Sequence, residues 1–209
     1  MSLLHFAQQG GVFMFPLIFL SLLSMAVGLE RAFYFANLEW GGEAFRRRLI
    51  TLLREGKADE AVLWLKGLRG AVAGTALAAV QRWSRGRTSV ENAMVAQSHR
   101  DQNALNRFLV ILETTVTASP LIGLLGTITG MMGVFRAVSS KMAENPQADT
   151  SGILAGIGEA LVATAAGILI AVVSLFLHNF FQRLAERQMD GAQDIANELV
   201  DLLDEKAHA

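Results

Sequence analysis

Long apolar runs alternate with charged stretches along this chain. Residues 12–29, 114–135 and 150–182 contain one charged side chain between them, that of Glu159. As helices, the three runs would be about 27, 33 and 50 Å long, whereas the hydrocarbon core of a bilayer is about 30 Å thick. Apolar runs in the core helices of soluble proteins are usually shorter. The pattern therefore predicts three membrane-spanning helices.

The charged stretches have a helical pattern of their own. Apolar residues recur at helical spacing between residues 43 and 110, and again in the C-terminal tail. These apolar stripes contain Phe45, Leu49, Leu52, Leu53, Ala61, Val62, Leu65, Leu68, Ile195, Leu199, Leu202 and Leu203. We expect helices that pack against neighbouring helices through these stripes. The tail also has a surplus of acidic residues, which we expect to be solvated.

The composition narrows the class of protein. The chain of 209 residues is 52% apolar and 18% charged, and the charged share is about 25% in soluble proteins. Nucleic-acid binding is disfavoured, because residues 36–113 balance twelve basic residues with eight acidic ones and contain no recognisable reader motif. Cysteine is absent, which excludes disulfides, thiolate metal sites and a cysteine nucleophile.

The distribution of basic residues predicts the orientation in the membrane. Residues 1–11 contain no Lys or Arg, residues 139–149 contain only Lys141, and residues 36–113 contain twelve. Lys and Arg near the ends of spans are held on the cytoplasmic side. We therefore expect the N-terminus outside and the C-terminus inside. The first span lacks the basic segment that precedes the apolar region of a signal peptide, so we expect it to be retained.

The predicted fold class is an all-α membrane protein with three transmembrane helices that are extended by cytoplasmic helices. The second and third spans form an antiparallel hairpin in this prediction. In chain order, the expected segments are a periplasmic N-terminus (1–11), transmembrane helix 1 (12–35), a cytoplasmic helical domain (36–112), transmembrane helix 2 (113–138), a periplasmic loop (139–149), transmembrane helix 3 (150–182) and a cytoplasmic helical tail (183–209).

Glycines are frequent in the second and third runs. They do not fit a nucleotide-binding loop, because the GxGxxG order, a Walker lysine and a preceding strand are all missing. Gly126 and Gly130, and likewise Gly152 and Gly156, are four residues apart and so lie on one face of a helix. Small residues at this spacing let helix backbones approach closely in lipid. We expect these four glycines to pack helices together.

Glu159 is the one acidic residue within the three apolar runs. An ionised carboxylate deep in a membrane costs roughly 2.5 to 3.5 kcal/mol on insertion scales, and no Lys or Arg in the three runs could offset it. The carboxyl would then be protonated for much of the time or would face a polar cavity. Either condition makes Glu159 a candidate proton carrier. The alternative is a structural carboxyl that is hydrogen-bonded at a helix interface.

Two threonines accompany Glu159. Thr127 is nine residues from Arg136 and Glu159 is nine residues from Thr150, so the two can lie at equal depth. Thr164 points about 140° away from Glu159 on an ideal helix. It therefore cannot share a narrow stripe with Glu159, but it could face an adjacent helix in an assembly.

The helix stripe that contains Glu159 also contains Ala163, Ala166 and Ile170, which would line a narrow, dry lumen. His178 at the inner end of the third span could relay protons, although a lone interfacial histidine is more often incidental.

Two segments resemble the signatures of one known family. Residues 118–132 read ASPLIGLLGTITGMM and resemble the Pro-x-x-Gly-Leu-x-Gly-Thr-x-x-Gly-Met signature of the MotA/TolQ/ExbB proton-channel family. Residues 156–167 read GIGEALVATAAG and resemble the Gly-Ile-x-Glu-Ala-Leu-x-Ala-Thr-Ala-x-Gly signature of that family. The likeness is greatest to the ExbB branch.

This resemblance implies a function and an assembly. It implies a protein of the bacterial inner membrane that forms a homopentameric ring, in contact with lipid, around helices of an ExbD-like partner. The complex would use the proton motive force to energise a TonB-like protein and, through it, transport across the outer membrane. No bond in a substrate would be made or broken, so we expect neither an enzyme nor a cofactor, metal or nucleic acid.

The same resemblance assigns roles to single residues. Glu159 would be the lumen carboxylate of the proton pathway, with Thr127 and Thr164 as its hydroxyls. Asn179 and Arg183, near the inner end of the third span, match family positions with weaker motif support. The partner helix would contribute an Asp, which explains why this chain contains only one of the two carboxylates of the proton relay.

Two other functions stay open. Thr129 and the paired methionines Met131 and Met132 stand where some relatives have an aromatic residue, so a TolQ-like subunit of the Tol-Pal envelope system is the first alternative. A non-conducting membrane scaffold is the second, with Glu159 as a structural carboxyl. Three spans argue against a MotA-like stator, which has four.

Overall fold

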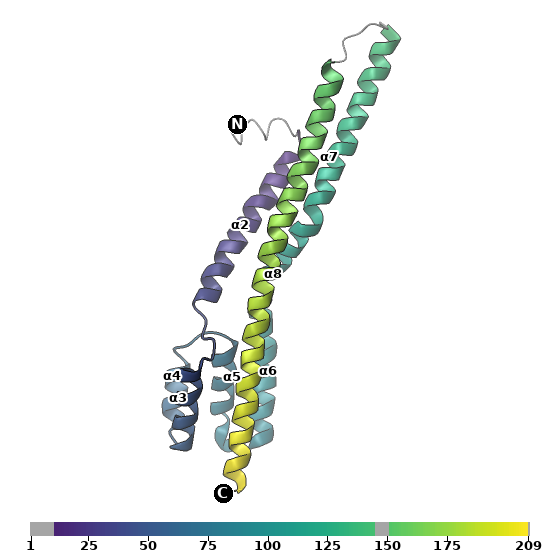
Figure 1. The fold of residues 1–209 in the computed structure, drawn as a ribbon. Helices are drawn as coiled ribbons and strands as arrows, with labels where there is room; N and C mark the ends of the chain where they lie inside the picture. Colours follow the sequence, from purple (N-terminus) through teal and green to yellow (C-terminus); the bar gives the residue numbers. More distant parts are fainter. Residues whose placement is uncertain (1–10, 145–150, 209) are drawn as a thin grey trace. The chain divides into compact units, whose positions relative to one another are not determined.

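The structure is a computed structural model that describes residues 11–144 and 151–208, without the side chains of residues 137, 140–144, 151–155, 159 and 206–208. All elements of these two ranges are helical (Figure 1). In chain order they are α2 (Met14–Ala36), α3 (Glu43–Arg54), α4 (Ala58–Leu65), α5 (Ala71–Val80), the short 3₁₀ helix η1 (Trp83–Arg85), α6 (Arg87–Asn106), α7 (Leu109–Glu144) and α8 (Ser151–His208).

The chain divides into two compact units. The first unit comprises Met1–Leu29 and Phe108–Asn179, and the second comprises Glu30–Arg107 and Phe180–Ala209. Helices α2 and α8 each contribute residues to both units.

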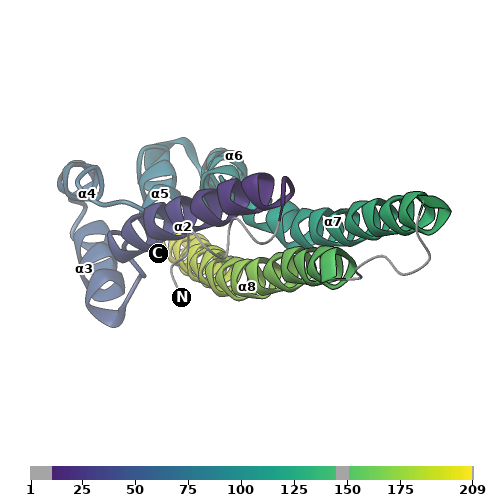
Figure 2. The ribbon, with the colours of Figure 1, turned by 90° about the horizontal axis from the view of Figure 1, so that it is seen from above.

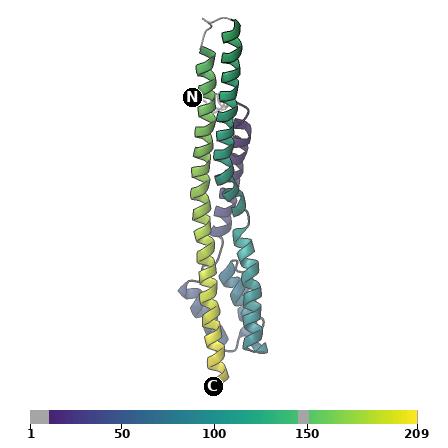
Figure 3. The same ribbon diagram turned by 90° about the vertical axis from the view of Figure 1, so that its right-hand side faces the viewer.

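Three helices in the described ranges are long and apolar enough to cross a membrane. They are Met14–Ala36, Leu109–Arg136 and the part of α8 within Gly156–Glu205. In the first unit α7 and α8 run side by side in opposite directions (Figures 1 and 3). Large apolar side chains project from all three helices, among them Phe19, Leu121 and Phe176, each more than half exposed. Within the described ranges, the prediction of an all-helical protein with three apolar helices that could span a membrane is confirmed.

Helix α7 ends later than the sequence predicts. Residues 139–144, which the prediction assigns to the periplasmic loop, form the last turn and a half of α7, and residues 145–149 lie outside the described ranges. Lys, Met, Ala and Glu in this stretch favour a helix. Pro146 is the first residue that opposes one, because the residue before a proline is driven out of the helical region.

Helices α6 and α7 are separated by a sharp break. Arg107 has an extended ψ of 134°, and Phe108 has a φ of 67°, the one positive φ of a non-glycine residue in the described ranges. A bulky side chain rarely adopts this left-handed conformation. The chain passes here from the second unit to the first.

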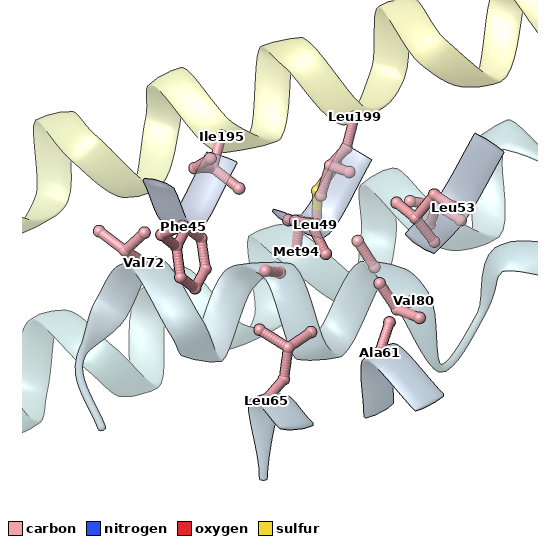
Figure 4. Packing of buried hydrophobic residues seen from close by; sticks show 13 residues of the cluster. Phe45, Leu49, Leu53, Ala61, Leu65, Val72, Val80, Met94, Ile195 and Leu199 are labelled. Carbon is pink, nitrogen blue, oxygen red and sulfur yellow. The ribbon is translucent and has the colours of Figure 1, made fainter. Parts of the chain in front are cut away.

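The second unit has a shared apolar core. Figure 4 shows Ile195 and Leu199 of α8 pointing toward the short helices that surround them. The cluster consists of Phe45, Leu49, Leu53, Ala61, Leu65, Val72, Ala76, Ala79, Val80, Val90, Met94, Ile195 and Leu199. Burial of each larger member contributes about 1.5 to 3 kcal/mol. The predicted packing of the apolar stripes is confirmed, and Leu52, Val62, Leu68, Leu202 and Leu203 cover the cluster as partly buried residues.

Helix α5 lies in the centre of the second unit and is buried on almost every side. Its sequence of small apolar residues allows close contact all round. Gln188 of α8, fully buried, secures its N-terminus: the side-chain oxygen accepts a hydrogen bond from the backbone N–H of Ala71 (3.1 Å), and the amide nitrogen donates to the carbonyl of Glu39 (2.9 Å). Both the oxygen and the nitrogen of this buried amide therefore have a hydrogen-bond partner.

The acidic side chains of the tail are largely exposed to solvent, as expected, and four of them lie close to basic residues of the second unit. Arg46 of α3 pairs with Asp194 at 3.1 Å and lies 3.9 Å from Glu198. Two further pairs, Arg54 with Glu205 and Arg87 with Asp204, connect α3 and α6 to α8. Exposed pairs of this kind contribute about 0 to 1 kcal/mol each, so they set the register of α8 more than its stability.

Candidate functional site

The seam between α7 and α8 in the first unit is built from residues that leave no room for larger side chains. A Cβ added to Gly126 would lie 3.0 Å from the Cβ of Ala163, and one added to Gly130 would lie 2.8 Å from the Cβ of Ala160. A Cβ on Gly156 would meet Val134 at 2.8 Å. The predicted packing role of these three glycines is consistent with their positions. The surroundings of Gly152 lie outside the description.

Two further glycines make closer approaches than those that the spacing singles out. A Cβ on Gly167 would lie 2.5 Å from the carbonyl oxygen of Ser119, and one on Gly123 would lie 2.9 Å from that of Ala163. The opposing atoms belong to backbone, which cannot move aside without moving the helix. The backbones of α7 and α8 are thus in direct contact. The small-residue spacing does not predict this pair, because the two glycines lie on different helices.

Thr127 and Thr164 meet at the centre of this seam. Their hydroxyl groups, both half-buried, are hydrogen-bonded to each other. The Thr164 hydroxyl is also in position to donate to the carbonyl of Gly123 (2.9 Å), and the Thr127 hydroxyl to the carbonyls of Gly123 and Ala160 (3.3 Å each). Each hydroxyl has one hydrogen, so the pair can redistribute two protons over several acceptors.

The Thr127 hydroxyl lies next to the helix turn that carries Glu159. Its acceptor Ala160 is the following residue of α8, so α7 and α8 are paired in the register that the sequence count predicts. The side chain of Glu159 lies outside the description. Thr164 differs from its prediction, because its partner is α7 of the same chain and no adjacent subunit is needed to satisfy it.

The expected dry lumen is not lined by the predicted alanines. Ala163 is 1% exposed and packs on the glycines of α7, and Ala166 belongs to a cluster with Met14 and Leu17 of α2, against which Ile170 packs. This face of α8 is thus occupied by α7 and α2 within one subunit. A helical wheel shows that residues share a face, but it cannot tell which helix covers that face.

A polar contact also joins α2 to α8 in the first unit. The Ser174 hydroxyl donates to the Ser24 hydroxyl at 3.1 Å, and both side chains are buried. On the same side, a Cβ on Gly28 would meet the side chain of Leu177 at 3.3 Å. Hydrogen bonds between helices stabilise bundles in lipid modestly, by about 0.6 kcal/mol on average. These serines are not among the predicted site residues, because their one signal in the sequence is a small hydroxyl within an apolar run.

The weaker candidates lie apart from the threonine pair. Nδ1 of half-buried His178 lies 3.5 Å from the side-chain oxygen of Asn179, at the limit of a hydrogen bond. Arg183 is exposed on α8, within the second unit. No group of metal-ligating side chains occurs in the part of the chain that the structure describes.

Comparisons with known proteins place the chain among membrane transport components. The sequence model of the MotA/TolQ/ExbB proton channel family matches residues 66–194. The biopolymer transport protein ExbB-like 3 of Synechocystis sp. is 30% identical over 181 residues, which cover 87% of this chain and 85% of that protein. ExbB-like 1 of the same organism is also 30% identical, over 91% of this chain and 75% of that protein. The Tol-Pal system protein TolQ of Pseudomonas aeruginosa is 32% identical over 57% of this chain and 50% of its own length.

Proposed function

Because the chain belongs to the MotA/TolQ/ExbB proton channel family, we propose that it is the proton-conducting subunit of an inner-membrane motor driven by the proton motive force. The protein crosses the membrane several times in this proposal, with its N-terminus in the periplasm and its C-terminus in the cytoplasm. The observation that carries the proposal is the hydroxyl pair of Thr127 and Thr164 beside the turn of α8 that carries Glu159.

Glu159 is the proton carrier in this mechanism. It is the one acidic residue in three apolar runs, and an ionised carboxylate there costs a few kcal/mol, so the carboxyl is protonated for much of the time or faces a polar cavity. The hydroxyl pair offers a donor and acceptors next to this turn, through which a proton can pass by hopping. Each proton that moves inward releases about 2.3 kcal/mol per 100 mV of membrane potential. Asn179, Arg183 and His178 are further candidates at the inner end of the third span.

The working assembly is a ring of identical subunits, a pentamer by family resemblance, around helices of an ExbD-like partner. Large apolar side chains that project from α7 and α8, such as Leu124, Ile128 and Leu169, support contacts with neighbouring helices and lipid. A partner Asp exchanges protons with Glu159, and the protonation change displaces the partner helices. A TonB-like protein transmits this motion to transporters in the outer membrane.

A TolQ-like role in the Tol-Pal system is the second candidate. The relative named TolQ is 32% identical over 57% of this chain, and the relative named ExbB-like 3 is 30% identical over 87% of it, so identity alone does not separate the two roles. Complementation separates the two roles. Restored TonB-dependent uptake in a strain without ExbB would support the first, and restored envelope integrity in a strain without TolQ would support the second.

Proton flux into liposomes that contain this chain and its partner tests the conducting role. We expect Glu159→Gln to abolish flux while the complex still assembles, because the amide cannot carry an exchangeable acidic proton. Glu113→Gln, at the inner end of α7, is the matched control and should keep its flux. Full flux in the Glu159 variant would disprove the proposal, and a complex without flux in any form would favour a scaffold.

A further inference from the structure

A groove of about 710 Å³ runs between α6 and α8 in the second unit. Thr75 of α5 contributes to its lining, with only 3% of its surface exposed, and its hydroxyl has no hydrogen-bond partner in the described part of the chain. A buried hydroxyl without a partner is unfavourable, because its lost hydrogen bonds to water are not replaced. The groove is therefore incomplete in the isolated subunit.

The lining of the groove suits the face of a helix. Small or apolar residues form its base, among them Met94, Ala192 and Ala196, and Val95 on its wall is 58% exposed. The polar residues of the lining are the amides Asn92, Gln193 and Asn197 together with the charged Arg87, Glu91 and Asp201. An apolar centre with a polar surround is how proteins receive an amphipathic helix.

Helix α4 presents a side chain of the matching kind. Leu63 is 71% exposed although its helix neighbours Ala61 and Leu65 are buried in the core. It lies on the same helix face as the acidic Asp59 and Glu60. An exposed leucine among charged residues adds nothing to the core of its own subunit.

Leu63 and the groove lie on different sides of the second unit. Helix α5 lies between α4 and α6 (Figures 1 and 2). A contact between α4 of one copy and the groove of another would join two different surfaces. Such head-to-tail contacts generate closed rings when the rotation closes.

The charges near the two surfaces are complementary. Arg82 and Arg85 are exposed just before α6, whose Arg87 lines the groove and is already paired with Glu91 and Asp204. Neither Arg82 nor Arg85 forms an ion pair within the described ranges, and the same holds for Asp59 and Glu60 of α4. Opposite charges would therefore meet where the first turn of α4 lies against Arg82 and Arg85, which favours a second copy of this chain over a purely apolar partner.

We infer that the groove receives α4 of a neighbouring copy, with Leu63 on the base formed by Ala192 and Ala196. This inference rests on the proposed assembly of identical subunits, and it names the cytoplasmic contact that would hold them together. The contact covers the Thr75 hydroxyl and offers it polar partners. It is separate from the α7/α8 seam.

Disulfide cross-linking tests the contact, because the chain contains no cysteine of its own. The double variant Leu63→Cys with Val95→Cys is oxidised in membranes that contain the complete complex. We expect a ladder of covalently linked chains that ends at the number of subunits in the ring. Each single variant should give no ladder. The pair Leu63→Cys with Glu43→Cys, both on the α3 and α4 side, is the matched control and should give none either.

The mass of the detergent-extracted complex separates failure of this contact from failure of the proposed assembly. An intact oligomer without a ladder would overturn the contact and leave the assembly standing, as would cross-links to a different protein or between two Val95→Cys chains. A monomer without a ladder would overturn both. As a second measurement, Leu63→Glu should reduce the oligomer, and an oligomer unchanged by this charge would count against the inference.

Discussion

The threonine pair places two exchangeable protons between two helix backbones. Because the Thr164 hydroxyl can donate to the carbonyl of Gly123 (2.9 Å), the Thr127 hydroxyl is free to donate either to Thr164 or to the carbonyl of Ala160. Reversal of these donors reorients both hydroxyls without moving a helix, which is the turning step that proton hopping through this pair would require. This property distinguishes the pair from hydroxyls that only bond back to their own helix, such as Thr114 and Ser119.

Valine and serine substitutions at Thr127 test this function. Thr127→Val keeps the shape of the side chain and removes the hydroxyl, and we expect proton flux to fall by at least about tenfold, the equivalent of roughly 1.4 kcal/mol in a barrier. Thr127→Ser should retain most of the flux. Thr114→Val, whose hydroxyl bonds to Val110 of the same helix, serves as the control. Equal flux in the serine and valine variants would show that the hydroxyl is dispensable.

Asp101 makes the stability of the second unit depend on pH. Burial raises the pKa of this carboxyl above its usual value, against the smaller opposing effects of the Gln97 hydrogen bond and the positive charge of Arg100. The folded chain then binds the proton more tightly than the unfolded chain. The free energy of unfolding should therefore fall as pH rises from about 4, the unfolded pKa, through the raised folded pKa.

Thermal unfolding of the detergent-extracted protein between pH 4 and pH 7 measures this effect. Asp101→Asn should flatten the decline in stability over that range, because the amide does not titrate. Asp190→Asn, at an exposed position of α8, should leave the decline unchanged. An identical pH profile in Asp101→Asn and the parent protein would contradict the assignment.

The α7/α8 seam depends on the absence of side chains at particular positions. Gly167 faces the carbonyl oxygen of Ser119, whereas Gly133 of α7 has no atom within 4 Å of an added Cβ. The two glycines therefore provide a matched pair. We expect Gly167→Ala to destabilise the first unit by about 1 to 3 kcal/mol through overpacking.

Gly133→Ala should be neutral or slightly stabilising, since alanine is favoured over glycine in a helix by about 1 kcal/mol. The midpoint of thermal unfolding in detergent distinguishes the two variants. A decrease of similar size in both would mean that the seam tolerates a methyl group and that its closeness is not essential.

At the scale of single helices, the sequence predicts well where helices form and predicts poorly which helices pack against each other. The apolar stripes of Phe45 and Ile195 correctly predict helices that pack together, because helical periodicity depends on one element alone. The face of α8 that contains Ala163 and Ala166 was assigned to a lumen, and it is instead covered by α7 and α2. Which helix covers a face depends on tertiary contacts, which periodicity does not record.

At the scale of the whole molecule, the predicted orientation follows from charge alone. The basic residues are concentrated in residues 36–113, so this segment should face the cytoplasm. Single cysteines at Ser139 and Asp59, in a chain that has none, allow this to be tested with a maleimide that cannot cross membranes. We expect Ser139→Cys to be labelled from the periplasmic side and Asp59→Cys only in inverted vesicles. The reverse pattern would refute the orientation.

The family was predictable from two short motifs, and it is confirmed by the match over residues 66–194. These motifs also contain the threonine pair and the seam glycines, because close packing and proton chemistry both restrict the residue types allowed. The break at Phe108 and the buried amide of Gln188 were not predictable. A left-handed phenylalanine and a glutamine that caps a distant helix have no local sequence signature.

The glycines and alanines of the α7/α8 seam have a thermodynamic consequence. Their side chains have no rotamers, so closing this contact freezes no side-chain motion and loses only backbone freedom. Leucine side chains in the same seam would lose rotamer freedom when the helices pack together, and they would regain part of it at higher temperature. The spacing of the two threonine hydroxyls is therefore set by the main chain of two helices, and it should change little with temperature.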